Sequence, residues 1–175
     1  CGQLSNVTYD LCTGNLGGLS KIWLCDAELI SGISIGTSTA YTQDVVTAVT
    51  FTTGDTKFMP FTMKKNTASF QSEVTVGDSN TYVSTTLNLV FPHQDSAKRV
   101  AAQSLLLAEA VAICLDKNNH YWLIGSKDNP LSIESGSADS GTNKDDSNNY
   151  TIAVSCESTE FPYEVDASII STICA

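Results

Sequence analysis

The stretch from Thr67 to Phe91 constrains the fold of this chain more than any other. It alternates polar and apolar residues on both sides of the turn-forming run at residues 77–80, as two paired β-strands do. Each arm is about ten residues long, longer than the usual strand, and a two-stranded hairpin is not stable alone in water. We therefore expect it to pair with further strands, of the same chain or of a neighbouring copy. Its polar face comprises Ser69, Gln71, Glu73, Ser84, Thr86 and Asn88.

The rest of the pattern predicts a mainly β fold, an antiparallel β-sandwich or partly closed barrel with one α-helix at about residues 95–108. Asp95 or Ser96 is the expected N-cap of that helix. Further hairpins are expected at 45–64 and 110–125, a short strand at 131–134, a polar loop at 135–149, and last strands at 150–156 and 163–173. Residues 1–20 are interpreted as an extended N-terminal arm, and 21–175 as a single β-sandwich domain.

The charge balance argues against a protein that grips nucleic acid. The chain has 19 acidic and 9 basic residues, a net charge of -10, and its only basic pairs are Lys64-Lys65 and Lys98-Arg99. Phosphate binding needs clustered Lys and Arg. Acidity does suit a surface that nucleic acid must pass without sticking. No run approaches the roughly 18 apolar residues of a membrane span.

The cysteines leave two interpretations of the N-terminus open. Cys1 fits either removal of an initiator Met or the lipidated first residue of a mature lipoprotein. Cys114 and Cys156 lie in apolar strand patterns, where free Cys packs as a small hydrophobe. A disulfide among Cys1, Cys12 and Cys25 stays open, but we expect reduced thiols made in a cytoplasm. Without a C-x-x-C pair, a zinc site is not expected.

No motif predicts catalysis, so we expect no enzyme and no cofactor. Neither His93 nor His120 accompanies a nucleophile in a recognisable pattern. The run from Asp139 to Asp146 offers oxygen ligands, but it lacks the regular alternation and closing Glu of a helix–loop–helix calcium site. A solvated turn is the favoured interpretation there, with calcium as the alternative.

The order of elements resembles the tail-tube proteins of tailed bacteriophages and related injection machines. The residues that carry the resemblance are a Gly-Gly-Leu-x-Lys-Ile-Trp opening from Gly17, the long hairpin, the Ala/Leu helix, the run Asp116-Lys-Asn-Asn-His-Tyr-Trp-Leu-Ile-Gly125, and Ser140-Gly141-Thr142 followed by Asn148-Asn149-Tyr150. The match covers residues 17–173.

The resemblance implies hexameric rings that stack into a hollow tube in the virion tail, assembled in the host cytoplasm. Its partners would be copies of itself and other virion proteins, with DNA passing through without specific binding and no membrane involved. The polar hairpin face would line the lumen. Contacts between subunits are then expected from the arm and two loops, at Cys1, Leu4, Leu11, Leu16, Tyr41, Asp139 and Asp145.

Two other functions stay open at this stage. The cysteine-bearing arm is not part of the usual tube pattern, which leaves room for another structural role in the phage head or neck. A cell-surface β-sandwich, as a lipoprotein or adhesin module, would also present a polar sheet face to water.

Overall fold

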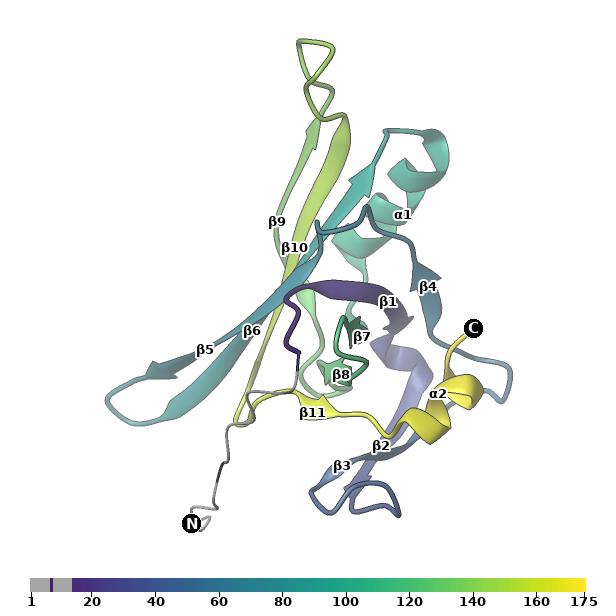
Figure 1. Ribbon diagram of the computed structural model, residues 1–175, viewed down its shortest axis with the longest axis vertical. Coiled ribbons are helices and arrows are strands. Elements are labelled where there is room, and N and C mark those ends of the chain that lie inside the picture. The colour runs from purple at the N-terminus through teal and green to yellow at the C-terminus, as the bar shows by residue number, and fades with distance from the viewer. Residues whose placement is uncertain (1–6, 8–13) are drawn as a thin grey trace.

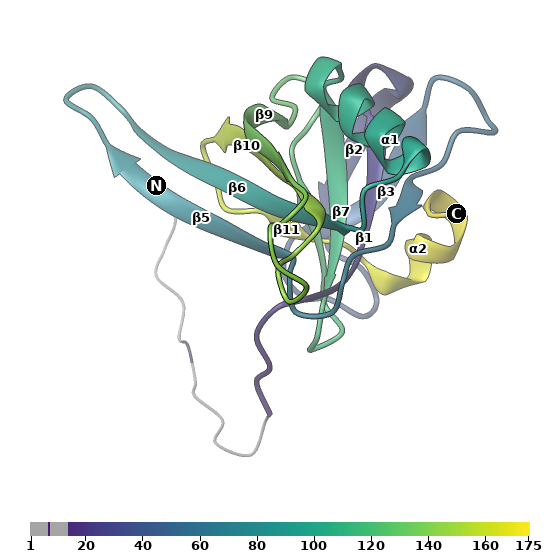
Figure 2. The ribbon, with the colours of Figure 1, turned by 90° about the horizontal axis from the view of Figure 1, so that it is seen from above.

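Three stacked layers of β-structure make up this protein (Figures 1 and 2). They are seen in a computed structural model that describes residue 7 and residues 14–175. A four-stranded sheet forms the first layer and a five-stranded sheet the second. A two-stranded ribbon with a short helix forms the third.

The four-stranded sheet contains the long hairpin. Its strand order is β5 (Ser69–Val76), β6 (Thr81–Pro92), β10 (Asn149–Ser158) and β9 (Ser132–Asp139), and every neighbouring pair is antiparallel. On β6 the even-numbered residues from Tyr82 to Pro92 are half-buried, and Val83 to Phe91 at odd positions are buried. The predicted hairpin is therefore confirmed, along with its two-faced character.

The five-stranded sheet is covered on both faces, which explains its nearly continuous apolar strands. Its order is β11 (Tyr163–Glu164), β8 (Tyr121–Ile124), β7 (Ala110–Asp116), β1 (Leu19–Asp26) and β4 (Met59–Phe61). One face of β1 and β7 packs on the four-stranded sheet through Ile22, Leu24, Ala112 and Cys114. The opposite face packs on the third layer through Trp23, Cys25, Val111 and Ile113.

The third layer pairs β2 (Ile30–Gly36) with β3 (Val45–Phe51) and adds α2 (Ala167–Ile173). A single turn of 3-10 helix (Ala27–Leu29) leads from β1 into β2. Phe58, which is fully buried, and Ile173 on α2 lie in the apolar cluster beneath this layer. Burying one such large side chain stabilises a fold by roughly 1.5–3 kcal/mol.

Helix α1 (Ser96–Leu107) follows β6 and lies within the limits predicted. The carboxylate of its N-cap, Asp95, accepts a hydrogen bond from the Lys98 amide. Ala102 and Leu105 are its buried residues, and they join the cluster between the two larger sheets.

The β7–β8 hairpin is also confirmed, and Asp116 organises its turn. One carboxylate oxygen accepts hydrogen bonds from the amides of Asn118 and His120, and the other accepts one from the Trp122 indole. Asn119 takes a positive φ of 66°, which Asn tolerates better than most residues. The Asp-x-Asn-Asn run thus has a structural role as a hairpin turn.

Three sequence-based assignments are wrong. Residues 45–64 do not form one hairpin, because β3 pairs with β2 and β4 pairs with β1. Residues 163–173 are β11 and α2 rather than a strand, since the Asp166 carboxylate accepts a hydrogen bond from the Ser168 amide and caps a helix despite its β-branched residues. The described residues therefore contain two α-helices, and the expected loop at 135–149 is shorter than predicted, because β9 continues to Asp139 and β10 begins at Asn149.

The sheets do not close into a barrel, so the structure supports the sandwich-like form of the expected fold. In the described part of the chain, no helix is long and apolar enough to cross a membrane.

Candidate functional site

The six polar hairpin residues singled out from the sequence lie together on one face of the four-stranded sheet. Three directly opposed pairs bring them together: Ser69 with Asn88, Gln71 with Thr86, and Glu73 with Ser84. We call this side, which points away from the five-stranded sheet, the outer face. Five of the six residues line a shallow groove of about 180 Å³: Gln71, Glu73, Ser84, Thr86 and Asn88.

Hydrogen bonds between side chains hold the groove's polar groups in place. The Gln71 Nε2 atom donates to Glu73 Oε1 at 2.6 Å, and the Thr86 hydroxyl donates to Glu134 Oε2 at 3.3 Å. Both contacts are exposed to water. The groove can therefore present oxygen acceptors and a negative charge to a molecule that lies along it.

The outer face continues across β10 and β9, which sequence reasoning missed. Opposite the hairpin residues, β10 places Ala153, Ser155 and Glu157 on the same side, and β9 adds Ser135 and Ser137. Composition hid β9, because its Ser- and Gly-rich sequence has weak strand propensity. On β10, by contrast, Ile152, Val154 and Cys156 alternate with polar residues, and this alternation could have shown that Ala153, Ser155 and Glu157 extend the polar face.

The outer face carries acidic residues and no base. Its carboxylates are Glu73, Glu134, Asp139 and Glu157, and the four strands contain no Lys, Arg or His. Glu134 reaches this face because the β9–β10 register shifts beside it. A ligand that needs positive charges, such as a nucleic-acid backbone, would find no partner here.

Two long strand edges of this sheet are unpaired within residues 14–175. The sheet ends at β5 on one side and at β9 on the other, and each strand has eight residues. They are staggered: β5 lies along the first eight residues of β6, whereas β9 pairs with the first seven of β10, at the opposite end of the sheet. The tip of the β5–β6 hairpin projects beyond the rest of the molecule (Figures 1 and 2).

The residues expected at contacts between subunits are scattered. Leu16 is exposed, and the Asn118 side chain holds its backbone by donating to the Leu16 carbonyl and accepting from the Leu16 amide. Tyr41 is half-buried. The pKa of its hydroxyl is raised mainly by this burial and, to a smaller extent, by the neighbouring Glu164 carboxylate. Asp139 and Asp145 are exposed at the β9–β10 loop. The remaining three, Cys1, Leu4 and Leu11, lie outside the described residues.

The β9–β10 loop uses its carboxylates to fix its own backbone. One Asp146 oxygen accepts hydrogen bonds from the amides of Thr142 and Asn143, which lowers the pKa of Asp146. Asp139 likewise accepts one from the Gly141 amide. Within the part of the chain that the structure describes, no three potential metal ligands cluster here or elsewhere.

The two histidines occupy turns. His93 takes a positive φ of 64° between β6 and α1. The Nδ1 atom of His120 lies 2.6 Å from Glu164 Oε1, and this hydrogen bond raises the pKa of the imidazole. Neither histidine lies on the outer face.

Four cysteines, Cys25, Cys114, Cys156 and Cys174, are buried free thiols. Burial raises the pKa of each, to about 11 for Cys25 and about 12 for Cys174. They pack as small apolar residues, as predicted for Cys114 and Cys156, and raised thiol pKa values make them poor nucleophiles.

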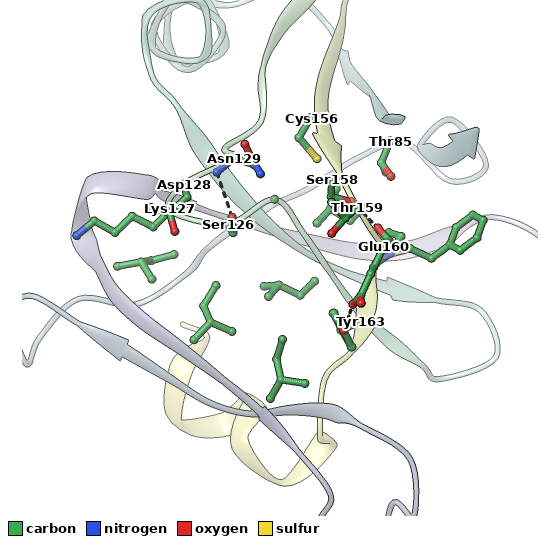
Figure 3. A pocket seen from close by; sticks show the side chains of 18 of the residues that line it. Thr85, Ser126, Lys127, Asp128, Asn129, Cys156, Ser158, Thr159, Glu160 and Tyr163 are labelled. Carbon is green, nitrogen blue, oxygen red and sulfur yellow. Dashed lines mark hydrogen bonds between the residues drawn. The ribbon is translucent and has the colours of Figure 1, made fainter. Parts of the chain in front are cut away.

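A cavity of about 440 Å³ opens on the other side of the sheet, beneath Thr85 and Cys156 (Figure 3). Strand β2, the end of β8 and the segments at 126–129 and 158–163 complete its wall. Every buried side-chain nitrogen or oxygen in the described residues has a hydrogen-bond partner, including the Thr85 hydroxyl, which pairs with Ser72. The cavity thus offers no orphaned polar group that would specify a ligand.

Comparison with known protein families, characterised proteins and solved structures found no match to this chain. The outer face and its two free edges therefore have to be interpreted from their own chemistry.

Proposed function

We propose that this chain is a structural virion protein, the tail-tube subunit of a tailed bacteriophage or a related injection machine. Copies assemble into rings, six to a ring by the resemblance described above, and the rings stack around a channel for DNA. The protein is then a scaffold rather than an enzyme, and other virion proteins cap the tube at its ends.

The observation that carries this proposal is the pair of free edges on the four-stranded sheet. Four strands that alternate in direction give β5 and β9 opposite directions. The β5 edge of one copy therefore meets the β9 edge of the next as an antiparallel pair when copies are related by rotation. Such head-to-tail pairing repeats until the ring closes and leaves no edge exposed.

The stagger of the two edges fits the same arrangement. Strands in a closed barrel tilt against its axis, and each strand is displaced along its neighbour. Because β5 and β9 occupy opposite ends of the sheet, the displacement is already present within one copy. A flat, unstaggered sheet would fit a closed ring less well.

The chemistry of the outer face supports its assignment to the channel. It presents hydroxyl and amide groups with four carboxylates and no base. A DNA backbone passing such a wall meets repulsion and no specific partner, so it slides. The central part of the opposite face packs on the core through Leu87, Leu89 and Phe91.

The proposal is tested by electron microscopy of the purified protein over a concentration series. Rods or stacked rings with a central channel are the expected result. Single copies at every concentration would refute the proposal and favour a surface module instead.

A pair of edge variants provides a matched control. Successive residues of an edge strand point their amides alternately to the partner and to the free side. Gly136→Pro and Ser137→Pro each remove one backbone amide of β9. The variant whose lost amide points to the free side should keep its fold and fail to assemble, whereas the other should lose a hydrogen bond to β10. Far-ultraviolet circular dichroism identifies the variant that keeps its fold, and normal rods from it would count against β9 as a pairing edge.

A further inference from the structure

Two exposed apolar surfaces flank opposite edges of the four-stranded sheet. The first, the hairpin underside, consists of Val74 and Val76, which are 50% and 77% exposed. Val74 lies opposite Val83 in the ladder, and Val83 is buried on the core-facing side of β6. The hairpin underside thus belongs to the inner side of the sheet, at the part of the hairpin that projects beyond the molecule (Figure 2).

The second surface, the helix stripe, is on α1 and consists of Val100 and Leu107, exposed at 54% and 82%. Val100 and Leu107 are seven residues apart and share a side of the helix, away from the buried Leu105. Large aliphatic side chains left in water in such a group indicate an interaction surface.

The helix stripe lies next to the β9 edge. Leu107 ends α1 three residues before Ala110, and Ala110 exchanges two backbone hydrogen bonds with Leu131, at 3.0 and 2.7 Å. Leu131 directly precedes the first residue of β9. The carboxyl end of α1 and the start of β9 are therefore neighbours, and α1 packs on the inner side of the sheet through the shared core cluster.

The two elements carry charges of opposite sign. Asp78 lies in the turn that follows Val76, and residues 67–92 contain no base, whereas α1 carries Lys98 and Arg99 and no acid. Glu73 points to the outer face and takes no part in this contact. Lys98 is already paired with Asp95 at 2.6 Å. Arg99 has no ion pair among the described residues, so it supplies free positive charge to the helix surface.

We propose that the hairpin underside of one copy docks on the helix stripe of the next copy around the ring. This rests on the proposed pairing of β5 with a neighbour's β9. When two antiparallel strands of eight residues overlap along their length, the Val76 end of β5 meets the Ser132 end of β9, to within a residue or two. That end of β9 is the one beside Leu107, so the two apolar surfaces come together on the inner side of the joined sheets.

This contact gives each ring joint a side-chain component in addition to its backbone hydrogen bonds. Backbone pairing at a strand edge does not select for the partner's sequence, because every strand offers the same amides and carbonyls. The hairpin–helix contact adds selectivity for a second copy of this chain and fixes the register of the strands.

Cross-linking between differently labelled copies tests the contact directly. Protein carrying Val76→Cys is mixed with protein carrying Leu107→Cys, assembled, and treated with a short bismaleimide. Peptide mass spectrometry then identifies which residues are joined, which separates the new cysteines from the native ones. Met59→Cys replaces Leu107→Cys in the control, since Met59 is an apolar residue on another sheet with 58% exposure.

A link between positions 76 and 107, with none between 76 and 59, is expected. Rods without the 76–107 link would overturn the docking and leave the tube standing, whereas absence of any assembly would overturn both. A second readout avoids cysteine altogether: Leu107→Ser should raise the concentration needed for rod formation at least about tenfold, and Met59→Ser should not. An equal effect of the two serine variants would also overturn the docking.

Discussion

If the outer face lines a DNA channel, as proposed, changing Glu73 to Lys should convert a wall that DNA slides past into one that binds it. Each copy contributes four carboxylates to the outer face and no base, so a ring of about six copies carries about 24 negative charges there. The substitution changes the charge of each copy by two units, so the net negative charge of the ring's outer face falls to about 12. It also places about six ammonium groups in one ring, at the groove lined by Ser84 and Thr86.

The size of the effect follows from counterion release. If each of about six lysines neutralises one phosphate, the logarithm of the binding constant falls with the logarithm of salt concentration with a slope of about -5. Between about 50 and 200 mM salt this amounts to a loss of about a thousandfold in affinity. Wild-type rods should show no such salt-dependent retention, because their outer face has no cation.

The assay is co-sedimentation of rods with a short fluorescent duplex across that salt range. Glu73→Gln, which removes the charge without adding a base, should retain far less DNA than Glu73→Lys. Glu28→Lys makes the same charge change at an exposed site away from the four-stranded sheet. If Glu28→Lys and Glu73→Lys rods retained DNA equally, or if neither did, the placement of Glu73 in the channel would be wrong.

Three further predictions concern the subunit itself. Leu87→Ala should lower the free energy of unfolding by roughly 2–5 kcal/mol, because Leu87 is fully buried, whereas Thr86→Ala on the outer face should cost less than about 1 kcal/mol by urea denaturation. The His120 imidazole should titrate above its usual midpoint of about 6.5 in an NMR pH series, because Glu164 raises its pKa. The contribution of this pair to folding stability is therefore complete below about pH 6.5 and is lost as the pH rises through the raised pKa. Glu164→Gln should return the midpoint toward 6.5, and an unchanged midpoint would contradict the assigned pair. Asn118→Ala should leave the fold intact but release the backbone of residue 16, detectable as faster amide exchange there, since the Asn118 side chain makes both hydrogen bonds to that residue.

The sequence predicts this fold best where the pattern is strictly periodic. The alternation along β6 gave the correct faces from Tyr82 to Leu89, and Asp95 was correctly predicted as a possible N-cap of α1. Because side chains alternate with a period of two, a polar strand face can be assigned without knowing what covers the other side.

Prediction failed where local composition and long-range pairing disagree. Strand β9 is rich in Ser and Gly and is a strand because β10 pairs with it, which no local signal contains. The end of the chain shows the reverse case, since the β-branched run before Cys174 favours a strand, whereas the cap at Asp166 and burial of Ile170 and Ile173 favour a helix. The free edges at β5 and β9, on which the proposed function depends, become visible only when the strand order is known.

A helical reconstruction of assembled rods by electron cryomicroscopy tests the central claim most directly. The account predicts β5 of each copy paired with β9 of the next, with Gln71, Glu73 and Thr86 facing the channel. Rods in which the outer face points away from the axis, or in which β5 and β9 remain unpaired, would contradict it.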